Sequence, residues 1–208
     1  MPIKLRLAVH AMTATLRAAG FSDDEPIEAQ AAVGLRSLPH RPRPADRCMA
    51  APELRTRQTA IGLGFEPVID PLLRDCDYGR WRGRTFTDIQ RTEARALADW
   101  MTDPAAAPHG GESLEDVSAR CAAWLSQQAD GSGQWLVVTH ASVIRLTMMR
   151  VLGAPLSAYW HVDAPPLAGV SLSFNRTWRL QLSGGLILRA GRPGPDGLDQ
   201  LRPTENEP

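Results

Sequence analysis

The segment Lys4–Thr13 reads Lys-Leu-Arg-Leu-Ala-Val-His-Ala-Met-Thr, and it decides which class of fold this sequence can adopt. Apolar side chains occupy every second position from Leu5 to Val9, a period that predicts a short β-strand buried mainly on one face. The alternation stops at His10, where small and polar residues begin. A strand that ends in a His places an imidazole at the rim of a sheet, where open α/β folds bind their ligands.

A second stretch, Trp135–Arg145, has the same design. Its first five residues predict a buried strand, His140 follows at once, and a helical segment comes next. We therefore expect His140 and His10 to face one pocket. The first N–H groups of that helix, at Ala141 and Ser142, would favour an anion there.

The composition excludes several classes of protein. Lys+Arg and Asp+Glu both number 23, so the formal net charge is zero and we expect neither nucleic acid nor a membrane surface as a partner. Three widely spaced cysteines form no C-x-x-C pair, which indicates neither a disulfide framework nor a zinc site. No apolar h-region precedes the first strand and no apolar run reaches membrane-spanning length, so we expect neither a signal peptide nor a membrane span. We expect a cytoplasmic globular protein.

Strand and helix patterns alternate along the chain, which predicts a three-layer α/β sandwich: a mostly parallel central sheet with helices on both faces. We place one domain at residues 1–189 and a disordered tail, rich in Gly, Pro and charge, at residues 190–208. Residues 39–44 form a Pro-rich exposed link. Further strands are predicted at 48–51, 68–70 and 135–139, with a terminal hairpin at 170–174 and 178–182. Helices are predicted at 14–19, 27–38, 52–63 (with Pro52 in its first turn), 86–101, 113–128 (with Ser113 as N-cap and Asp116 at the reciprocal capping-box position) and 142–152.

Two more segments carry charges that could act at the sheet rim. Arg55 falls in the first turn of a helix, where its planar fork suits the oxygens of a bound phosphate. Asp75 and Asp77 lie in a loop dense in charge, Gly and aromatics, and a carboxylic acid there could protonate a leaving oxygen. Each residue alone has a plainer explanation, as a structural His, a surface Arg or a solvated loop. Their joint pattern indicates a site for a tetrahedral oxyanion.

This joint pattern resembles the histidine phosphatase superfamily, the phosphoglycerate mutase-like enzymes, over about residues 4 to 175. The segments that carry the resemblance are the first-His motif Val9–Ala11 with a hydroxyl at Thr13, the Arg-x-x-Gln-Thr-Ala motif Arg55–Ala60, the acid-bearing loop Leu73–Gly83, the Gly-Gly-Glu-Ser segment Gly110–Ser113 and the second-His strand Val137–His140.

The resemblance implies a phosphomonoesterase that needs neither metal nor cofactor. His10 would attack phosphorus and carry a phosphohistidine, while Arg55 and His140 neutralise charge on the equatorial oxygens. Asp75 would protonate the leaving alcohol and then activate water. The substrate would be a small phosphorylated metabolite, held by Thr13, Arg17, Arg55 and Ala141.

The sequence departs from the family pattern at three positions. Val9 replaces the first Arg, Ala11 replaces a Gly, and Asp75 replaces a Glu, so the acid could instead be Asp77. Loss of the Arg could remove about 2–4 kcal/mol of transition-state binding, by analogy with the loss of an oxyanion donor. The candidates to substitute for it are Arg17, Arg57, Arg80, Arg82 and Arg84.

Two other functions are compatible with these residues. One is a catalytically impaired phosphate sensor or interaction module on the same fold, for which Val9 and Asp75 argue. The other is a phosphoglycerate mutase-type phosphotransferase, which the compact chain disfavours. The sequence does not indicate an oligomeric state.

Overall fold

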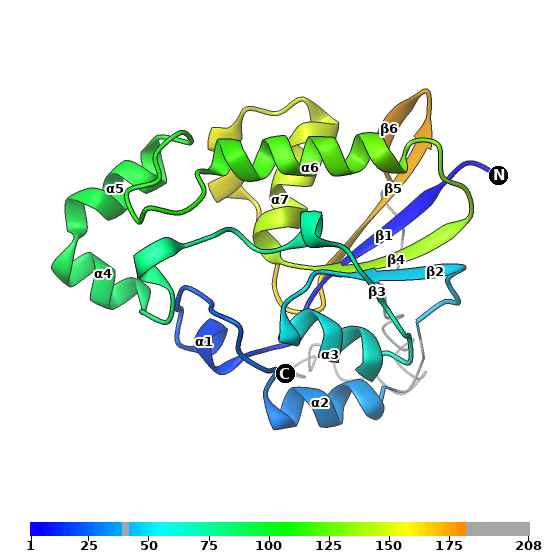
Figure 1. The fold of residues 1–208 in the computed structure, drawn as a ribbon, viewed down its shortest axis with the longest axis horizontal. Helices are drawn as coiled ribbons and strands as arrows, with labels where there is room; N and C mark the ends of the chain where they lie inside the picture. Colours follow the sequence, from blue (N-terminus) through cyan, green and yellow to red (C-terminus); the bar gives the residue numbers. More distant parts are fainter. Residues whose placement is uncertain (39–41, 182–208) are drawn as a thin grey trace, which may run out of the picture.

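The central sheet has six strands and is flanked by helices, in a computed structural model that describes residues 1–38 and 42–181 (Figure 1). The predicted tail and residues 39–41 of the predicted link lie outside the described residues. The strands are β1 (Lys4–Val9), β2 (Arg47–Ala50), β3 (Val68–Ile69), β4 (Gln134–Thr139), β5 (Gly169–Asn175) and β6 (Thr177–Gln181). The helices are α1 (Ala14–Arg17), α2 (Ala29–Arg36), α3 (Leu54–Gly62), α4 (Phe86–Thr92), α5 (Ala94–Thr102), α6 (Leu114–Gln128) and α7 (Ala141–Leu152), with 3₁₀ helices η1 (Pro71–Leu73), η2 (Gly79–Trp81) and η3 (Leu156–His161).

The strand order is β3-β2-β4-β1-β5-β6, with β3, β2, β4 and β1 parallel to one another. The hairpin β5–β6 extends the sheet, and β5 is antiparallel to β1. β1 thus sits between β4 and β5, and its C-terminal end meets that of β4. The predicted mostly parallel sheet is confirmed.

Two apolar layers cover the sheet, because alternate residues of each central strand point to opposite faces. Leu7 of β1 and Val137 of β4 belong to the core that includes Trp124 of α6. Ala8 and Val138, the next residues along, belong to a second core beneath α2 and α3. β1 is therefore buried on both faces at its C-terminal half. Figure 1 shows α6 and α7 on one side of the sheet and α2 and α3 on the other.

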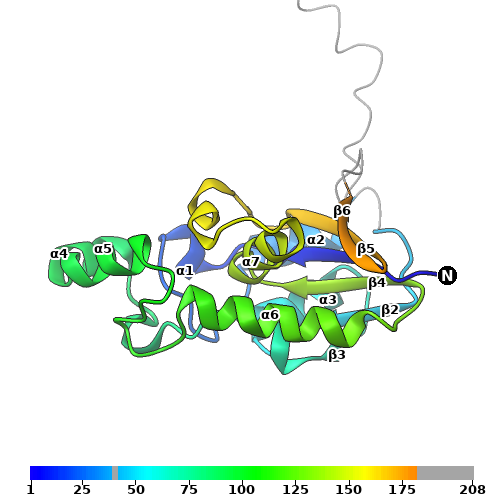
Figure 2. The ribbon, with the colours of Figure 1, turned by 90° about the horizontal axis from the view of Figure 1, so that it is seen from above.

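The predicted helix at 86–101 is wrong as a single element. Glu93, at φ −141°, separates α4 from α5. Its carboxylate accepts hydrogen bonds from the guanidinium groups of Arg80 and Arg84 and from the indole N–H of Trp81. These contacts with the preceding loop hold Glu93 out of the helical conformation. In both Figure 1 and Figure 2, α4 and α5 lie beyond the sheet, at the end opposite the N-terminus.

The helix starts differ in how well the sequence indicated them. The predicted cap at Ser113 is confirmed, since its side chain and Asp116 form a reciprocal capping box. Pro52, however, lies before the N-cap of α3 and not in its first turn. Ala51 still pairs with β4 through its N–H, so the chain stays extended until Glu53.

None of the helices in residues 1–38 and 42–181 combines the length and the apolar character needed to cross a lipid bilayer. Cys48, Cys76 and Cys121 are free and buried.

Candidate active site

His10 and His140 lie side by side, because β1 and β4 are neighbouring parallel strands in register. Val9 pairs with Thr139, so the residue after each strand falls at the same edge of the sheet. The backbone N–H of His10 donates a hydrogen bond to the Thr139 carbonyl at 3.0 Å. The imidazole centroids are 5.2 Å apart, edge to face, and both rings are buried. The structure thus brings together the two imidazoles that the strand pattern predicted to meet.

The His10 ring is held as a neutral imidazole. Its Nδ1 lies 2.8 Å from the Ala11 carbonyl, and a carbonyl can only accept, so Nδ1 carries the proton and Nε2 keeps its lone pair. The pKa of His10 is lowered to about 3, mainly by burial. The charges of His140 and Arg55 also lower this pKa, and they outweigh the Ala11 carbonyl and Asp75, which raise it. The unprotonated Nε2 is the form that a nucleophile needs.

This pKa has a consequence for stability. Between about pH 6.5 and pH 3 the unfolded chain protonates His10 and the folded chain does not, so the unfolded state binds more protons. We expect the free energy of unfolding to fall as pH falls through this range, by at most about 1.4 kcal/mol per pH unit from this group. Urea unfolding of the wild type and His10→Gln between about pH 7 and pH 5 measures it. Identical slopes in both proteins would contradict the expectation.

Arg55 projects from the first turn of α3. This helix follows β2, whose C-terminal end lies at the same edge of the sheet as those of β1 and β4. Its side chain is 1% exposed. One guanidinium nitrogen, Nη2, donates to the Asp75 Oδ2 at 2.9 Å. The other, Nη1, donates to the Asp23 carbonyl and lies 3.7 Å from Glu25. Arg55 is therefore a fixed cation beside the acid-bearing loop.

Asp75 is an ionised carboxylate at the centre of the site. It accepts hydrogen bonds from Arg55, from the Ser142 hydroxyl at 2.5 Å and from the Cys76 N–H, and its Oδ2 is 3.4 Å from His140 Nδ1. Burial raises the pKa of Asp75, but His140, Arg55 and the Ser142 hydroxyl together lower it well below its usual range. The carboxylate thus holds the cations that a bound phosphate would also use.

Asp77, the other candidate acid, forms no hydrogen bond or ion pair with His10 or His140. Its carboxylate accepts from the Gly79 N–H and from Arg82, and its side chain is 40% exposed. Asp75 is the carboxylate that the structure brings to the two imidazoles.

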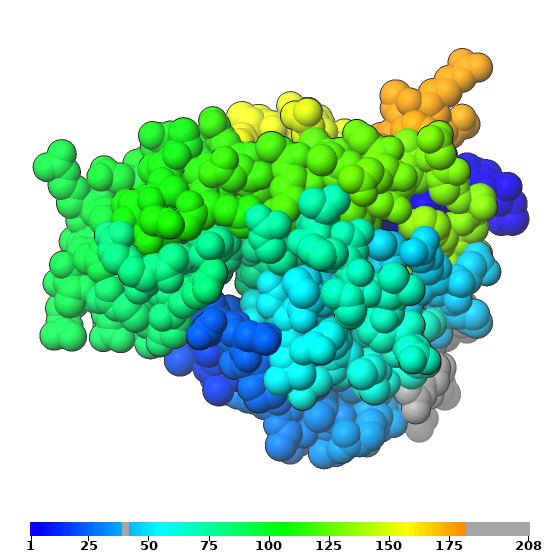
Figure 3. Space-filling view, in the orientation of Figure 1, coloured from blue at the N-terminus to red at the C-terminus, as the bar shows by residue number. Residues whose placement is uncertain are grey.

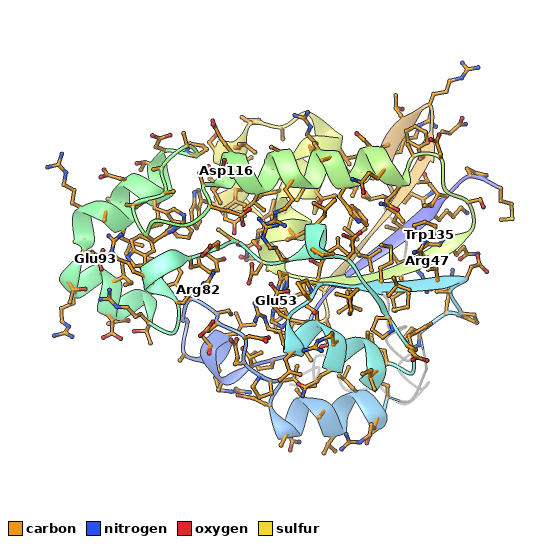
Figure 4. The ribbon with its side chains drawn as sticks, in the orientation of Figure 1. Arg47, Glu53, Arg82, Glu93, Asp116 and Trp135 are labelled. Atoms are coloured by element: carbon orange, nitrogen blue, oxygen red, sulfur yellow. The ribbon has the colours of Figure 1, made fainter. Side chains whose placement is uncertain are left out.

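Glu53 belongs to the same cluster and was missed by the sequence analysis. Its Oε2 accepts from His140 Nε2 at 2.9 Å, and its Oε1 accepts from the Asp75 backbone N–H at 2.9 Å. Figure 4 labels it at the junction of β2 and α3. The available signal was a carboxylate at a helix N-cap two residues before Arg55. Carboxylates therefore face both ring nitrogens of His140 and fix the orientation of the ring.

We expect Glu53→Gln to lower kcat roughly 10- to 100-fold, because a hydrogen bond to a charged group is worth about 1.5–3 kcal/mol. The amide keeps the shape of the side chain but removes the charge that orients His140. Phosphatase kinetics with a urea unfolding curve measure the effect. The exposed Glu66 supplies the control variant Glu66→Gln, and equal kinetics in the two variants would contradict a role for Glu53.

The Gly-Gly-Glu-Ser segment braces the loop that carries Asp75. A Cβ at Gly111 would overlap the Asp77 carbonyl, so the two chains pack backbone to backbone. Glu112 accepts from Asp77 N–H and from the side chains of Arg74 and Arg120. Buried Arg120 also donates to the carbonyls of residues 72, 74 and 75. This hydrogen-bond network fixes the position of the loop that carries Asp75.

Two cavities meet at Asp75. The larger, of about 530 Å³, has His10 and Asp75 on its wall together with Val9, Ala141, Ser142 and Arg145. The smaller, of about 300 Å³, lies on the other side of Asp75 and is lined by polar residues that include Glu53, Arg55 and Arg82. On this face Figure 3 shows a hollow between the blue segment near residue 25, the cyan segment near 50 and the green segment beyond 75.

Two of the predicted substrate-binding residues lie elsewhere. Thr13 caps α1 through the Leu16 N–H, and its hydroxyl donates to Glu25. Arg17 is 64% exposed and binds Glu28 through two hydrogen bonds. Both are occupied by these local contacts and line neither cavity. Ala141 does line the cavity of His10.

None of the arginines predicted to replace the missing Arg lines the cavity of His10. Arg80 and Arg84 bind Glu93, and Arg82 binds Asp77. Arg57 lines neither cavity. Arg145 lines the cavity of His10, stacks over the Tyr159 ring at 5.2 Å and forms no ion pair with a carboxylate of the described residues.

Comparison with known proteins places the site in a family. A model of the histidine phosphatase superfamily (branch 1) matches residues 26–182, a range that contains Arg55, Asp75 and His140 and begins after His10.

Two curated relatives are phosphatases. One, a glucosyl-3-phosphoglycerate phosphatase of Mycolicibacterium vanbaalenii, is 30% identical over 143 residues, 62% of this chain and 60% of that protein. The other, an adenosylcobalamin/α-ribazole phosphatase of Salmonella typhimurium, is 30% identical over 128 residues, 58% and 63% of the two chains. The chain therefore spans about three fifths of the length of these relatives.

A solved structure has the same fold. The α-ribazole phosphatase from Shigella flexneri aligns with a TM-score of 0.72 and 22% identity over 86% of this chain and 96% of that chain. Since the family model takes in most of the sequence and the residues gathered around Asp75, the chain belongs to the histidine phosphatase superfamily.

Proposed function

We propose that the protein is a phosphomonoester hydrolase that acts on a small phosphorylated metabolite through a phosphohistidine on His10. The observation that carries the proposal is the neutral His10 ring, with Nε2 unprotonated, on the wall of a cavity beside Arg55 and His140. The two curated relatives named as phosphatases of small phosphorylated molecules support it.

In the first step the His10 Nε2 lone pair forms a bond to phosphorus while the bond to the leaving oxygen breaks. The leaving oxygen takes a proton from Asp75. In the second step water attacks phosphorus, Asp75 takes the proton of that water, and the P–N bond breaks to release phosphate and neutral His10. Arg55, His140 and the uncapped N–H groups at the start of α7 stabilise the equatorial oxygens.

Asp75 must gain a proton before it can act as the acid. A bound phosphate would place a negative charge beside the carboxylate and take over its cationic partners, and both changes raise the pKa of Asp75. Substrate binding therefore prepares Asp75 for proton transfer. The proton can come from the monoanionic form of the phosphomonoester itself.

Arg145 supplies the cation that Val9 lacks. It lies one helical turn beyond Ala141 and Ser142, and helical side chains lean toward the N-terminus, so the guanidinium can reach a phosphate held there. We expect Arg145→Ala to lower kcat/KM about 100-fold, as loss of one oxyanion donor does. The exposed Arg150 of the same helix gives the control variant Arg150→Ala.

A rescue experiment identifies the missing charge. Val9 lines the same cavity from β1, so Val9→Arg in the Arg145→Ala background returns a cation to it. We expect part of the lost kcat/KM to return. No recovery in a folded double variant would mean that Arg145 serves another purpose.

We also propose that residues 1–189 form one catalytic domain and that the protein works in the cytoplasm. The single sheet and the three free, buried cysteines support these two proposals.

An impaired phosphate sensor is the second candidate function. The observation in its favour is that an apolar Val9 lines the cavity while the Asp75 carboxylate holds Arg55. Such a protein would bind inorganic phosphate without forming a phosphoenzyme.

Trapping of the phosphoenzyme in denaturant separates the two functions. The protein is mixed with ³²P-labelled phosphomonoester in EDTA and quenched in denaturant. An acid-labile, base-stable label on the protein is expected for the hydrolase. Phosphate binding without label and without turnover would overturn the hydrolase in favour of the sensor.

A further inference from the structure

The cavity of His10 must hold the leaving group of the substrate. Displacement at phosphorus is in line, so the leaving oxygen points away from the attacking nitrogen. With phosphorus about 3–3.5 Å from His10 Nε2, the alcohol extends into the remaining space of this 530 Å³ cavity. The walls of that space therefore determine which alcohols fit.

Apolar and aromatic residues make up most of these walls, and six of them carry aromatic rings. They come from separate parts of the chain that stand around the carboxyl ends of β1 and β4, at the left of the sheet in Figure 1. The aromatic lining residues are Phe21, Tyr78, Phe86, Trp100, Tyr159 and Trp160. Further apolar surface is added by Leu16 and by Ala164, Pro165 and Pro166.

The rings hold one another in a fixed arrangement. Trp100 packs edge to face against Trp160 at 5.0 Å, Phe21 at 5.7 Å and Tyr78 at 6.3 Å between centroids. Trp160 in turn meets Tyr159 at 4.9 Å. Edge-to-face pairs of this kind resist rearrangement, so the slot between the rings is formed before a ligand arrives.

Part of this aromatic cluster serves the fold alone. Trp81 is fully buried, contacts Phe21 and Trp100, and does not line the cavity. Trp160 is only half-buried and Phe86 is 36% exposed, and both line the cavity. These two rings present surface that the core does not use.

We propose that the leaving group of the substrate carries a planar aromatic ring, which packs against Trp160 and its neighbours. This inference rests on the proposed function. A polyhydroxylated leaving group would lose hydrogen bonds to water on entering walls that are mostly apolar, whereas a flat ring gains both burial and ring packing.

The test compares adenosine 5′-phosphate with ribose 5-phosphate. In both, the leaving oxygen is the primary 5-oxygen of a ribose, so the chemical difficulty of the step is matched, and the adenine base is the main difference. Stacking of a base on an aromatic side chain is worth about tenfold or more in affinity. We expect kcat/KM to favour the adenosine compound at least about tenfold.

Trp160→Ala should lower that preference about fivefold or more, and Phe86→Ala is a second variant at a more exposed wall if the first does not fold. Trp178 lies outside the cavity, against Phe174, and supplies the control Trp178→Ala, which should keep the preference of the wild type.

Equal kcat/KM for the two compounds, or a preference unchanged by both cavity variants, overturns the inference and leaves the hydrolase standing. Absence of turnover and of labelled protein with either compound overturns the inference and the hydrolase together.

Discussion

His10→Ala is expected to lower kcat by at least about 10⁴-fold and to abolish the acid-labile phosphoenzyme, because no other group can take over the attack on phosphorus. In the His pair, both nitrogens of His140 face carboxylates and His10 Nδ1 faces the Ala11 carbonyl, which leaves His10 Nε2 as the nitrogen for the attack. The carboxylates of Glu53 and Asp75 therefore stand between the His140 nitrogens and an incoming phosphorus atom. Turnover of p-nitrophenyl phosphate and ³²P trapping measure the two effects.

The control is His161→Ala, which removes an exposed His at the end of η3 that does not line the cavity. That variant should keep the activity of the wild type. Residual turnover in His10→Ala within about tenfold of the wild type would show that phosphorus is attacked directly by water, since a lost nucleophile costs far more. The phosphohistidine mechanism would then be wrong even if hydrolysis itself is real.

The strands that position the site could be predicted from the sequence because their signals are local. Alternating apolar residues mark β1, and a His follows both β1 and β4. The parallel register of these strands then forces the two imidazoles together. The capping box at Ser113 is equally local, since its two partners are three residues apart.

The errors came from contacts between distant segments. Nothing within residues 86–101 indicates that Glu93 will leave the helix, because its three partners lie in the loop before it. Contacts of this kind also bear on Arg17, predicted to bind substrate: it forms an ion pair with Glu28 before the start of α2, and its role with substrate stays a prediction.

The same limit applies to the residues that were missed. Glu53 contacts His140, which lies 87 positions later in the sequence. Arg145 reaches the cavity only because α7 packs beside β1. The aromatic wall combines residues from near 20, 80, 100 and 160, so no single stretch reveals it. Local patterns identified the rim of the sheet, and the packing of the loops decided which charged and aromatic side chains share it.

Asp75→Asn is expected to lower kcat about 10²- to 10⁴-fold with an aliphatic phosphomonoester, the usual loss for a missing general acid and base. With p-nitrophenyl phosphate the result should differ in kind. Nitrophenolate leaves without a proton, so the first step survives, whereas release of phosphate still lacks its base. We expect a burst of one equivalent of nitrophenolate followed by slow turnover and accumulation of phosphohistidine. Rapid-mixing absorbance and ³²P trapping detect both.

In the same variant, the affinity for inorganic phosphate should rise although kcat falls. The Asp75 carboxylate occupies Arg55 and the Ser142 hydroxyl in the resting site, so removing its charge leaves these groups free to hold phosphate. We therefore expect inorganic phosphate to bind Asp75→Asn more tightly than the wild type. The matched control is Asp77→Asn in the same loop, whose carboxylate binds Arg82 and forms no hydrogen bond or ion pair with His10 or His140. If Asp77→Asn shows the burst and Asp75→Asn does not, the acid is Asp77, and the loop must rearrange when substrate binds.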